Sequence, residues 1–194
     1  MNSKRIVAQL DRILKPIGFS RHGTAWNRSV GPFIDVLAVQ ASKSREAITV
    51  NAGVLHRSVY TKCWDQVLPP FIDEAFCTVR ARIGQLIDGR DLWWNPAPAD
   101  AADDIADKVA NHVLPFFEQM HSVDAMVQFL EDGQVLNQRH PPPITYLAIL
   151  RYEQGDARAA CALLADLQRR DVGAWRPLIR RVSAAIEGIS ASPP

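Results

Sequence analysis

The chain has 194 residues, of which 47% are hydrophobic and 22% charged, and a net charge of +1; this composition is typical of a globular protein and excludes a disordered one. Its three cysteines, Cys63, Cys77 and Cys161, are widely spaced and form no CxxC pair, which argues against a disulfide framework or a zinc knuckle and for a reducing compartment. Charged residues interrupt the N-terminal apolar pattern, and no run approaches the roughly 18 apolar residues of a membrane span. We therefore expect a cytoplasmic protein.

Charge is distributed unevenly along the chain. Residues 1–62 contain ten Lys and Arg against three Asp and Glu, a balance of +7, whereas residues 63–130 contain four against eleven, a balance of −7. The two segments can attract each other within one fold, or they can give the surface a dipole that steers a charged partner. The pattern alone leaves both interpretations open.

The first half of the chain contains one helix pattern followed by strand patterns. Apolar residues recur at helical spacing over residues 3–15, and Pro16 and Gly18 end this helix. Alternation and apolar runs then predict strands at residues 26–30, 33–41, 47–55 and 77–83. Because the links are short, we expect a mostly antiparallel sheet of about four strands.

The second half is predicted to be helical. An aspartate-rich segment at residues 100–104 favours the positive end of a helix that runs to about residue 120, and Ser122 is a plausible cap for the next helix. The remaining predicted helices cover residues 123–131, 144–154, 157–170 and 174–187.

The last helices follow a distinct pattern. Gly155 and Asp156 separate two alanine-rich amphipathic segments, which resembles one tetratricopeptide-type helix hairpin, although a single copy cannot form a solenoid. We therefore predict an α+β domain over residues 1–132, a linker over residues 133–142, and a helical extension over residues 143–190 packed on the domain.

Three blocks carry a family resemblance: LKPIGFSRHGTAWNR at residues 14–28, VQASKSREAITVNAGV at residues 39–54 and CTVRARIGQLIDGRDLWW at residues 77–94. Together they resemble the bacterial domain of unknown function 4304 family, over about residues 3–120. The resemblance implies no established activity and no catalytic residues. Small domains of this kind occur in bacterial toxin–immunity neighbourhoods, which is a hint about functional class.

Arg80 and Arg82 form the main candidate site. Residues two apart on a strand project from the same face, roughly 7 Å apart, and Thr49 and Asn51 of the preceding predicted strand can complete a polar shelf beside them. Paired guanidinium groups suit a carboxylate or a phosphate. The structural alternative, which we favour, is that Asp35, Asp88 or Asp91 already neutralises them.

The segment after this strand is the second candidate. Asp88-Gly89 predicts a turn, with Arg90 and Asp91 just beyond it. Trp93 and Trp94 are adjacent, so in an extended segment they point to opposite sides, and we expect one of them to be buried. An exposed tryptophan beside arginine is typical of an interface hot spot, but packing against the C-terminal helices explains it equally well.

Catalytic signals are weak. The five histidines are scattered, and no HExxH, GxSxG or P-loop motif is present. We expect no cofactor or metal, and nucleic acid is a weaker candidate than protein because no aromatic-interleaved basic run is found. The sequence favours a non-enzymatic protein that binds another protein, with a toxin-neutralising immunity protein as the specific form. The alternative is a module for a small anionic ligand or nucleotide, catalytic or not, that uses Arg80 and Arg82.

Overall fold

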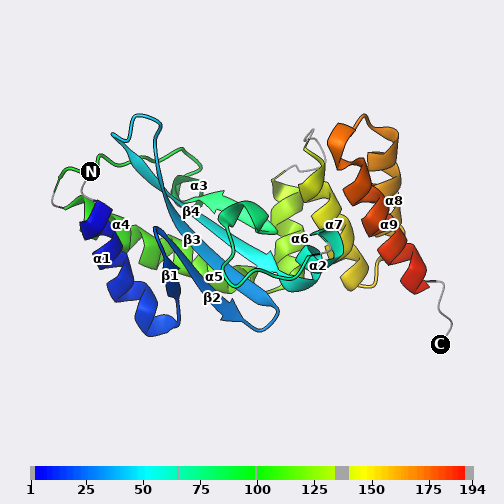
Figure 1. The fold of residues 1–194 in the computed structure, drawn as a ribbon, viewed down its shortest axis with the longest axis horizontal. Helices are drawn as coiled ribbons and strands as arrows, with labels where there is room; N and C mark the ends of the chain where they lie inside the picture. Colours follow the sequence, from blue (N-terminus) through cyan, green and yellow to red (C-terminus); the bar gives the residue numbers. More distant parts are fainter. Residues whose placement is uncertain (1–2, 65, 99, 134–139, 191–194) are drawn as a thin grey trace. The chain divides into compact units, whose positions relative to one another are not determined.

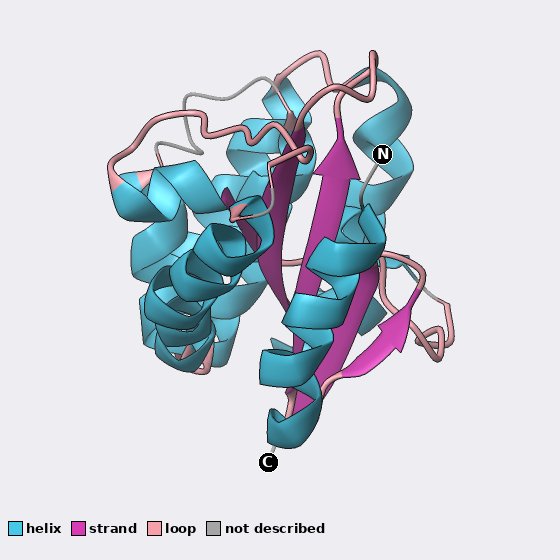
Figure 2. Cartoon of the chain, turned by 90° about the vertical axis from the view of Figure 1, so that its left-hand side faces the viewer, coloured by secondary structure: helices cyan, strands magenta, loops and turns pink. Residues whose placement is uncertain are grey.

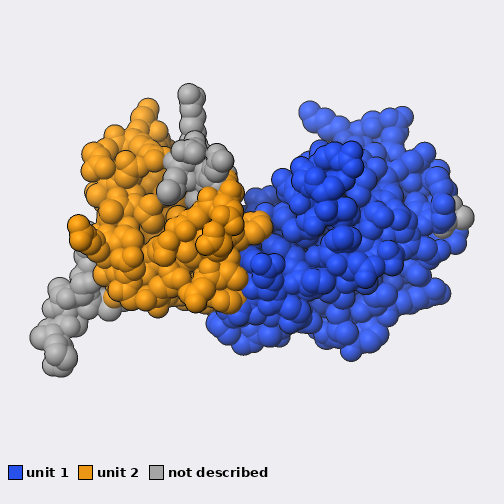
Figure 3. All heavy atoms as spheres, turned by 180° about the vertical axis from the view of Figure 1, so that it is seen from behind, with its two compact units in different colours: residues 1–55, 69–121 blue, residues 56–68, 122–194 orange. Residues whose placement is uncertain are grey.

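The computed structural model describes residues 3–64, 66–98, 100–133 and 140–190. The chain forms two compact units (Figure 3): unit 1 comprises residues 1–55 and 69–121, and unit 2 comprises residues 56–68 and 122–194. The α+β class is confirmed, because a sheet and helices both contribute to unit 1, and helices make up unit 2.

The core of unit 1 is a five-stranded antiparallel sheet in the order β1-β2-β3-β4-β5 (Figures 1 and 2). Its strands are β1 (Ser20–His22), β2 (Ala25–Val30), β3 (Phe33–Ala41), β4 (Ile48–His56) and β5 (Val79–Arg82). The expected count of four strands was wrong by one. The additional strand, β1, is short, polar and exposed throughout, so it carries no hydrophobic alternation and is defined only by its pairing with β2.

Helices cover one face of this sheet, which we call the helix-covered face. Helix α1 (Ser3–Leu14) reaches it through Asp11, which accepts a hydrogen bond from Nε1 of the buried Trp26 at 2.8 Å. Phe117 of α5 (Leu114–Met120) contacts Phe19, with 5.9 Å between ring centroids. Glu118 of α5 also pairs with Arg28, which projects from the same side of β2 as Trp26, so α1 and α5 lie on one side of the sheet.

The helix that ends in α5 is continuous but irregular. It begins as α4 (Ala101–Lys108), widens into a π-helical segment, η3 (Val109–Val113), and then continues as α5. Pro115 lacks an N–H and its ring clashes with the carbonyl four residues earlier. The helix thus accommodates Pro115 by a wider turn directly before it.

The opposite side of the sheet, the loop-covered face, is covered by irregular chain. Asn27 both donates to the carbonyl of Ile72, at 3.1 Å, and accepts from its backbone N–H, at 2.6 Å. A Cβ atom on Gly53 would lie 2.7 Å from Cβ of Cys77, so glycine allows the chain to approach β4 closely. Strand β4 is consequently buried along its whole length.

The short elements of unit 1 connect these layers. They are the 3-10 helices η1 (Lys15–Ile17) and η2 (Glu74–Phe76), and the helix α3 (Ile83–Ile87). The strand expected to extend to Ile83 ends at Arg82, where Oε1 of Gln85 accepts a hydrogen bond from the Arg82 backbone N–H at 2.7 Å. This cap starts a helix rather than continuing the strand.

Unit 2 is helical. It contains α2 (Arg57–Trp64), α6 (Val123–Asp132), α7 (Pro141–Glu153), α8 (Ala157–Arg169), η5 (Gly173–Trp175) and α9 (Arg176–Ser190). Helix α2, which lies between β4 and β5 in the chain, packs against α7 and α9, and Arg181 Nη1 donates to the carbonyl of Cys63 at 2.8 Å. The chain therefore enters this unit twice.

The expected domain division at residues 132 and 143 stays a prediction, because compactness does not test whether a segment folds independently. Most of the expected linker, residues 134–139, lies outside the described residues. Ser122 caps α6 as expected, accepting from the Ala125 backbone N–H at 3.4 Å. Among the described residues, none of the helices has both the length and the apolar content needed to cross a membrane.

Candidate functional site

Strand β5 presents Arg80 and Arg82 on the loop-covered face, while Val79 and Ala81 are buried. In the antiparallel register, Asn51 lies opposite Arg82 and Gly53 lies opposite Arg80. Arg80 and Arg82 therefore project from the same side of the strand, as expected for residues two apart. Each guanidinium already has a carboxylate partner.

Arg80 pairs with Glu74, which precedes it by six residues. Its Nε and Nη2 atoms donate to the two carboxylate oxygens at 2.5 and 3.2 Å. The Glu74 side chain is only 13% exposed, whereas that of Arg80 is 51% exposed. This bidentate ion pair fixes the orientation of the guanidinium, while the Arg80 side chain stays partly exposed to solvent.

Arg82, Asp91 and Trp93 form a second, linked group. Arg82 Nη1 lies 2.9 and 3.0 Å from the Asp91 oxygens, and its guanidinium carbon lies 5.3 Å from the centre of a Trp93 ring. Trp93 Nε1 donates to Asp91 at 2.9 Å. Hydrogen bonds from Trp93 and Arg82 lower the pKa of Asp91, so the carboxylate stays charged. We call Glu74, Arg80, Arg82, Asp91 and Trp93 the β5 face.

A close backbone approach holds Asp91 and Trp93 beside the strand. A Cβ atom on Gly84 would collide with the carbonyl oxygen of Arg90 and lie 2.7 Å from the Leu92 nitrogen. Only glycine permits the turn to pack here. Arg90 itself pairs with Asp88 across the turn, and its side chain is 82% exposed.

The other expected site residues have structural roles. Thr49 is fully buried and donates to the Leu92 carbonyl at 2.8 Å, and Asn51 donates to Oε1 of Gln40 at 2.8 Å. Trp94 is buried, bonds to Asp104 through Nε1 at 2.7 Å, and forms a two-way backbone bridge with Ile48. Thr49 is thus bonded to the segment after β5 and Asn51 to strand β3, and neither forms part of an open polar shelf with the arginines.

Asp35, a candidate partner for the arginines, lies on the helix-covered face instead. This carboxylate is fully buried, accepts from Arg28 Nε at 2.8 Å and lies 2.7 Å from His121 Nε2. Glu118 also pairs with Arg28, at 2.6 Å. This cluster was not predicted from the sequence, although a lone aspartate within the apolar run FIDVLAV indicates a buried charge that needs a partner.

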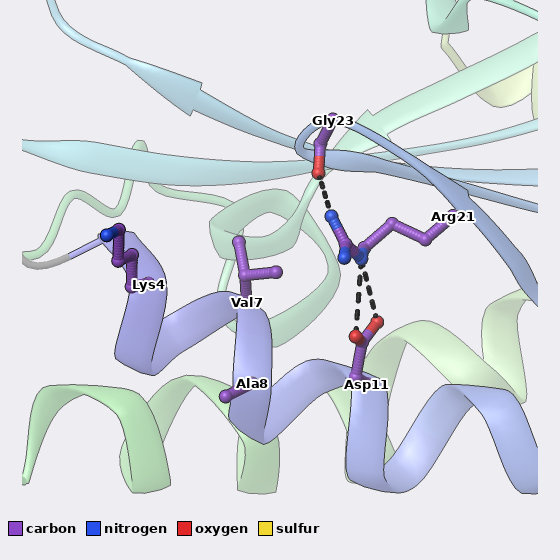
Figure 4. A pocket seen from close by; sticks show the side chains of 6 residues that line it. All are labelled: Lys4, Val7, Ala8, Asp11, Arg21 and Gly23. Carbon is purple, nitrogen blue, oxygen red and sulfur yellow. Dashed lines mark hydrogen bonds and ion pairs between the residues drawn. The ribbon is translucent and has the colours of Figure 1, made fainter.

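A pocket of about 380 Å³ lies between α1 and the β1 hairpin, and Figure 4 shows the side chains that line it. Arg21 extends from β1 toward α1, where its Nε lies 3.1 Å from Asp11, and its Nη1 donates to the Gly23 carbonyl at 2.8 Å. Lys15 and Trp26 also bond to Asp11. These polar groups satisfy one another, so the arrangement fastens the β1 hairpin to α1.

Unit 2 contains a polar cluster around Glu153. Its carboxylate accepts from Ser58 and, at 3.2 Å, from Lys62. Burial lowers the pKa of the nearby His56, and the charge of Glu153 only partly opposes this effect. Lys62 Nζ donates hydrogen bonds to Ser58 Oγ and to Glu153, so in this arrangement it is a donor to Ser58 and not the base that would activate it as a nucleophile. The cluster links α2 to α7.

Two of the three cysteines are buried and unsuited to nucleophilic chemistry. Burial raises the pKa of Cys63 to about 12 and raises that of Cys77 as well, which makes both thiols poor nucleophiles. Within the part of the chain that the structure describes, no three His, Cys, Asp or Glu side chains are grouped so as to hold a metal ion.

Comparison with protein families supplies the classification. Residues 10–119 match the family described as Domain of unknown function (DUF4304). The chain belongs to this family. The match includes all five strands and ends within α5, so the DUF4304 region coincides closely with the sheet and its helices. No curated protein and no solved structure matched the chain.

Proposed function

We propose that this DUF4304 protein acts by binding another protein through the β5 face. The observation that carries the proposal is the Arg82–Asp91–Trp93 group, in which a stacked guanidinium and a partly exposed indole are held by hydrogen bonds. Tryptophan and arginine are the residues most enriched at interface hot spots. Side chains that are already ordered lose less conformational entropy when a partner binds.

The carboxylate partners of Arg80 and Arg82 argue against a small anionic ligand or nucleotide as the main target. Such a ligand has to displace Glu74 from Arg80 or Asp91 from Arg82, because these carboxylates occupy the donors that it needs. A protein surface can instead add contacts around the existing pairs. The proposal is accordingly a non-enzymatic one.

The finer form of the proposal is that the partner is a toxin and that the protein neutralises it as an immunity protein in a bacterial cytoplasm. The support comes from the kind of genomic neighbourhood in which domains resembling this one occur. Three free cysteines, two of them buried, are consistent with a reducing compartment.

A pull-down from the native host, followed by affinity measurement on each captured protein, tests the proposal. We expect Trp93→Ala and Arg80→Glu, two changes within the β5 face, to weaken the relevant complex at least about tenfold, as changes at interface hot spots do. Arg5→Glu, which reverses an exposed charge on α1, is the matched control. Circular dichroism shows whether each variant is folded.

Two outcomes contradict the proposal. One is a partner whose affinity is unchanged by both substitutions. The other is a phosphate-like ion that binds Arg80 and Arg82 and releases Glu74, which favours the ligand-binding alternative. Trp94→Ala is unsuitable as a test because Trp94 is buried, so its loss reports on stability.

A further inference from the structure

A second candidate site lies in unit 2, where α8 ends and α9 begins. A hollow of about 220 Å³ is lined by Gln168, Val172, Arg176, Ile179 and Arg180. Val172 and Ile179 are buried and provide apolar walls, whereas Arg176 and Arg180 are exposed. The hollow therefore combines an apolar interior with a cationic rim.

The rim arginines differ from the arginines around them. Arg176 and Arg180 lie one helical turn apart on α9, so both guanidinium groups project from the same side of the helix. Within the described residues, neither forms an ion pair with a carboxylate. By contrast, Arg169 and Arg170 both pair with Asp166.

The local charge is strongly positive. Residues 169–181 contain five arginines and one aspartate, and Arg181 is bonded to the carbonyl of Cys63. Arg176 and Arg180, which form no ion pair within the described residues, are therefore exposed cations beside an apolar hollow. A ligand with carboxylates next to an aliphatic chain matches both the charge of these arginines and the apolar hollow beside them.

The volume and lining of the hollow restrict the class of ligand that it can bind. Pockets for drug-sized ligands run to roughly 300–1,000 Å³, so this hollow is large enough for one side chain and too small for a nucleotide cofactor. Single-stranded nucleic acid needs aromatic rings on which bases can stack, and the lining has none. The nearby Trp175 ring is in contact with Trp64 and His140.

We propose that this hollow binds an acidic segment of a partner protein, with one aliphatic side chain inserted between Val172 and Ile179 and flanking carboxylates on Arg176 and Arg180. The site belongs to unit 2, whereas the β5 face belongs to unit 1. The inference therefore stands independently of the proposed function, and either can fail alone.

The test uses the full chain and a fluorescein-labelled pentapeptide, Glu-Asp-Leu-Asp-Glu, with binding followed by fluorescence anisotropy. A second peptide replaces the central leucine with glycine. We expect the leucine peptide to bind about tenfold more tightly, as burial of one leucine side chain predicts. We expect its affinity to fall when salt is raised from about 0.05 to about 0.3 M.

Variants locate the binding on the molecule. The double reversal Arg176→Glu with Arg180→Glu is expected to weaken binding at least about tenfold, because it replaces two attractive contacts with repulsive ones. The matched control is Arg158→Glu, an exposed charge reversal on α8 of the same unit. Trp93→Ala leaves this peptide's affinity unchanged if the two sites are separate.

Three results overturn the proposal: equal affinity for the leucine and glycine peptides, an equal loss in Arg158→Glu, or binding of inorganic phosphate or an oligonucleotide in preference to the leucine peptide. The first two indicate attraction to net positive charge alone. Circular dichroism on the double variant separates a lost site from a lost fold.

Discussion

Arg82 and Asp91 lie nine residues apart in the chain, yet Nη1 of Arg82 lies 2.9 and 3.0 Å from the two Asp91 carboxylate oxygens. The turn that separates them folds back on the end of β5, which brings Trp93 over the guanidinium. Asp91 thus neutralises the charge of Arg82, and Asp91 and Trp93 together hold its guanidinium in place.

The pKa of Asp91 should depend on Trp93 more than on any other neighbour. The hydrogen bond from the indole is the largest cause of the lowered pKa, and the bond from Arg82 is the second. Trp93→Phe removes the indole donor, so we expect the pKa of Asp91 to rise toward its ordinary value of 3.8. Carbon-detected NMR titration of the carboxylates measures the change, and Asp88, which is paired with Arg90, serves as the unaffected reference.

Gly84→Ala should destabilise unit 1. The new methyl group meets the backbone at Arg90 and Leu92, which cannot move as a flexible side chain can, and overpacking of this kind costs about 1–3 kcal/mol. Chemical denaturation measures the free energy of unfolding. Gly89→Asn is the control, because Gly89 has positive φ with nothing near its Cβ position, and asparagine tolerates that conformation. Equal stability for both variants refutes the close-approach interpretation.

Asp35→Ala should cost far more stability than Glu118→Ala, although both carboxylates pair with Arg28. Asp35 is fully buried, and removing one partner of a buried ion pair costs about 3–5 kcal/mol. The Glu118 side chain is 62% exposed, so its loss should cost less than about 1 kcal/mol. Urea unfolding of the two variants gives the comparison. Similar losses contradict the assignment of Asp35 as the buried anchor.

His56 should make the protein less stable in mild acid. Burial lowers its pKa in the folded state below the ordinary 6.5, so the unfolded chain binds the proton more readily. The free energy of unfolding therefore decreases as pH falls through the unfolded pKa and levels off below the folded pKa. Urea unfolding at about pH 7.5 and about pH 5.5 should show a larger loss for the native chain than for His56→Gln. His22→Gln, at an exposed histidine, should behave like the native chain.

One of the three thiols should react in the folded protein. Cys161 is exposed, whereas Cys63 and Cys77 are buried with raised pKa values. A colourimetric thiol reagent is expected to label one cysteine rapidly under native conditions and all three in denaturant. Cys161→Ser should abolish the rapid phase. Rapid labelling that persists in this variant means that a buried thiol is accessible.

The sequence by itself determined the elements whose local signals are strong. Apolar periodicity located α1, and the continuous run of β3 matched its strand at both ends, Phe33 and Ala41, because burial dictates the spacing of apolar side chains. The family could also be identified from sequence blocks, since residues 10–119 match it. Strand β1 could not be found this way, because its polar residues gain their conformation from the hydrogen bonds of β2.

Only the tertiary structure decided which charges meet. The sequence identified Arg80 and Arg82 as neighbours on one face and offered Asp35, Asp88 and Asp91 as their partners. It did not show that Asp91 is the one that pairs with Arg82 and that Glu74 pairs with Arg80, or that Asp35 lies against Arg28 and His121. Ion pairs depend on how loops fold over the sheet, and that path depends on backbone contacts such as the one that Gly84 permits. For the same reason, only the three-dimensional structure distinguishes Arg176 and Arg180, which form no ion pair within the described residues, from Arg169 and Arg170, which pair with Asp166.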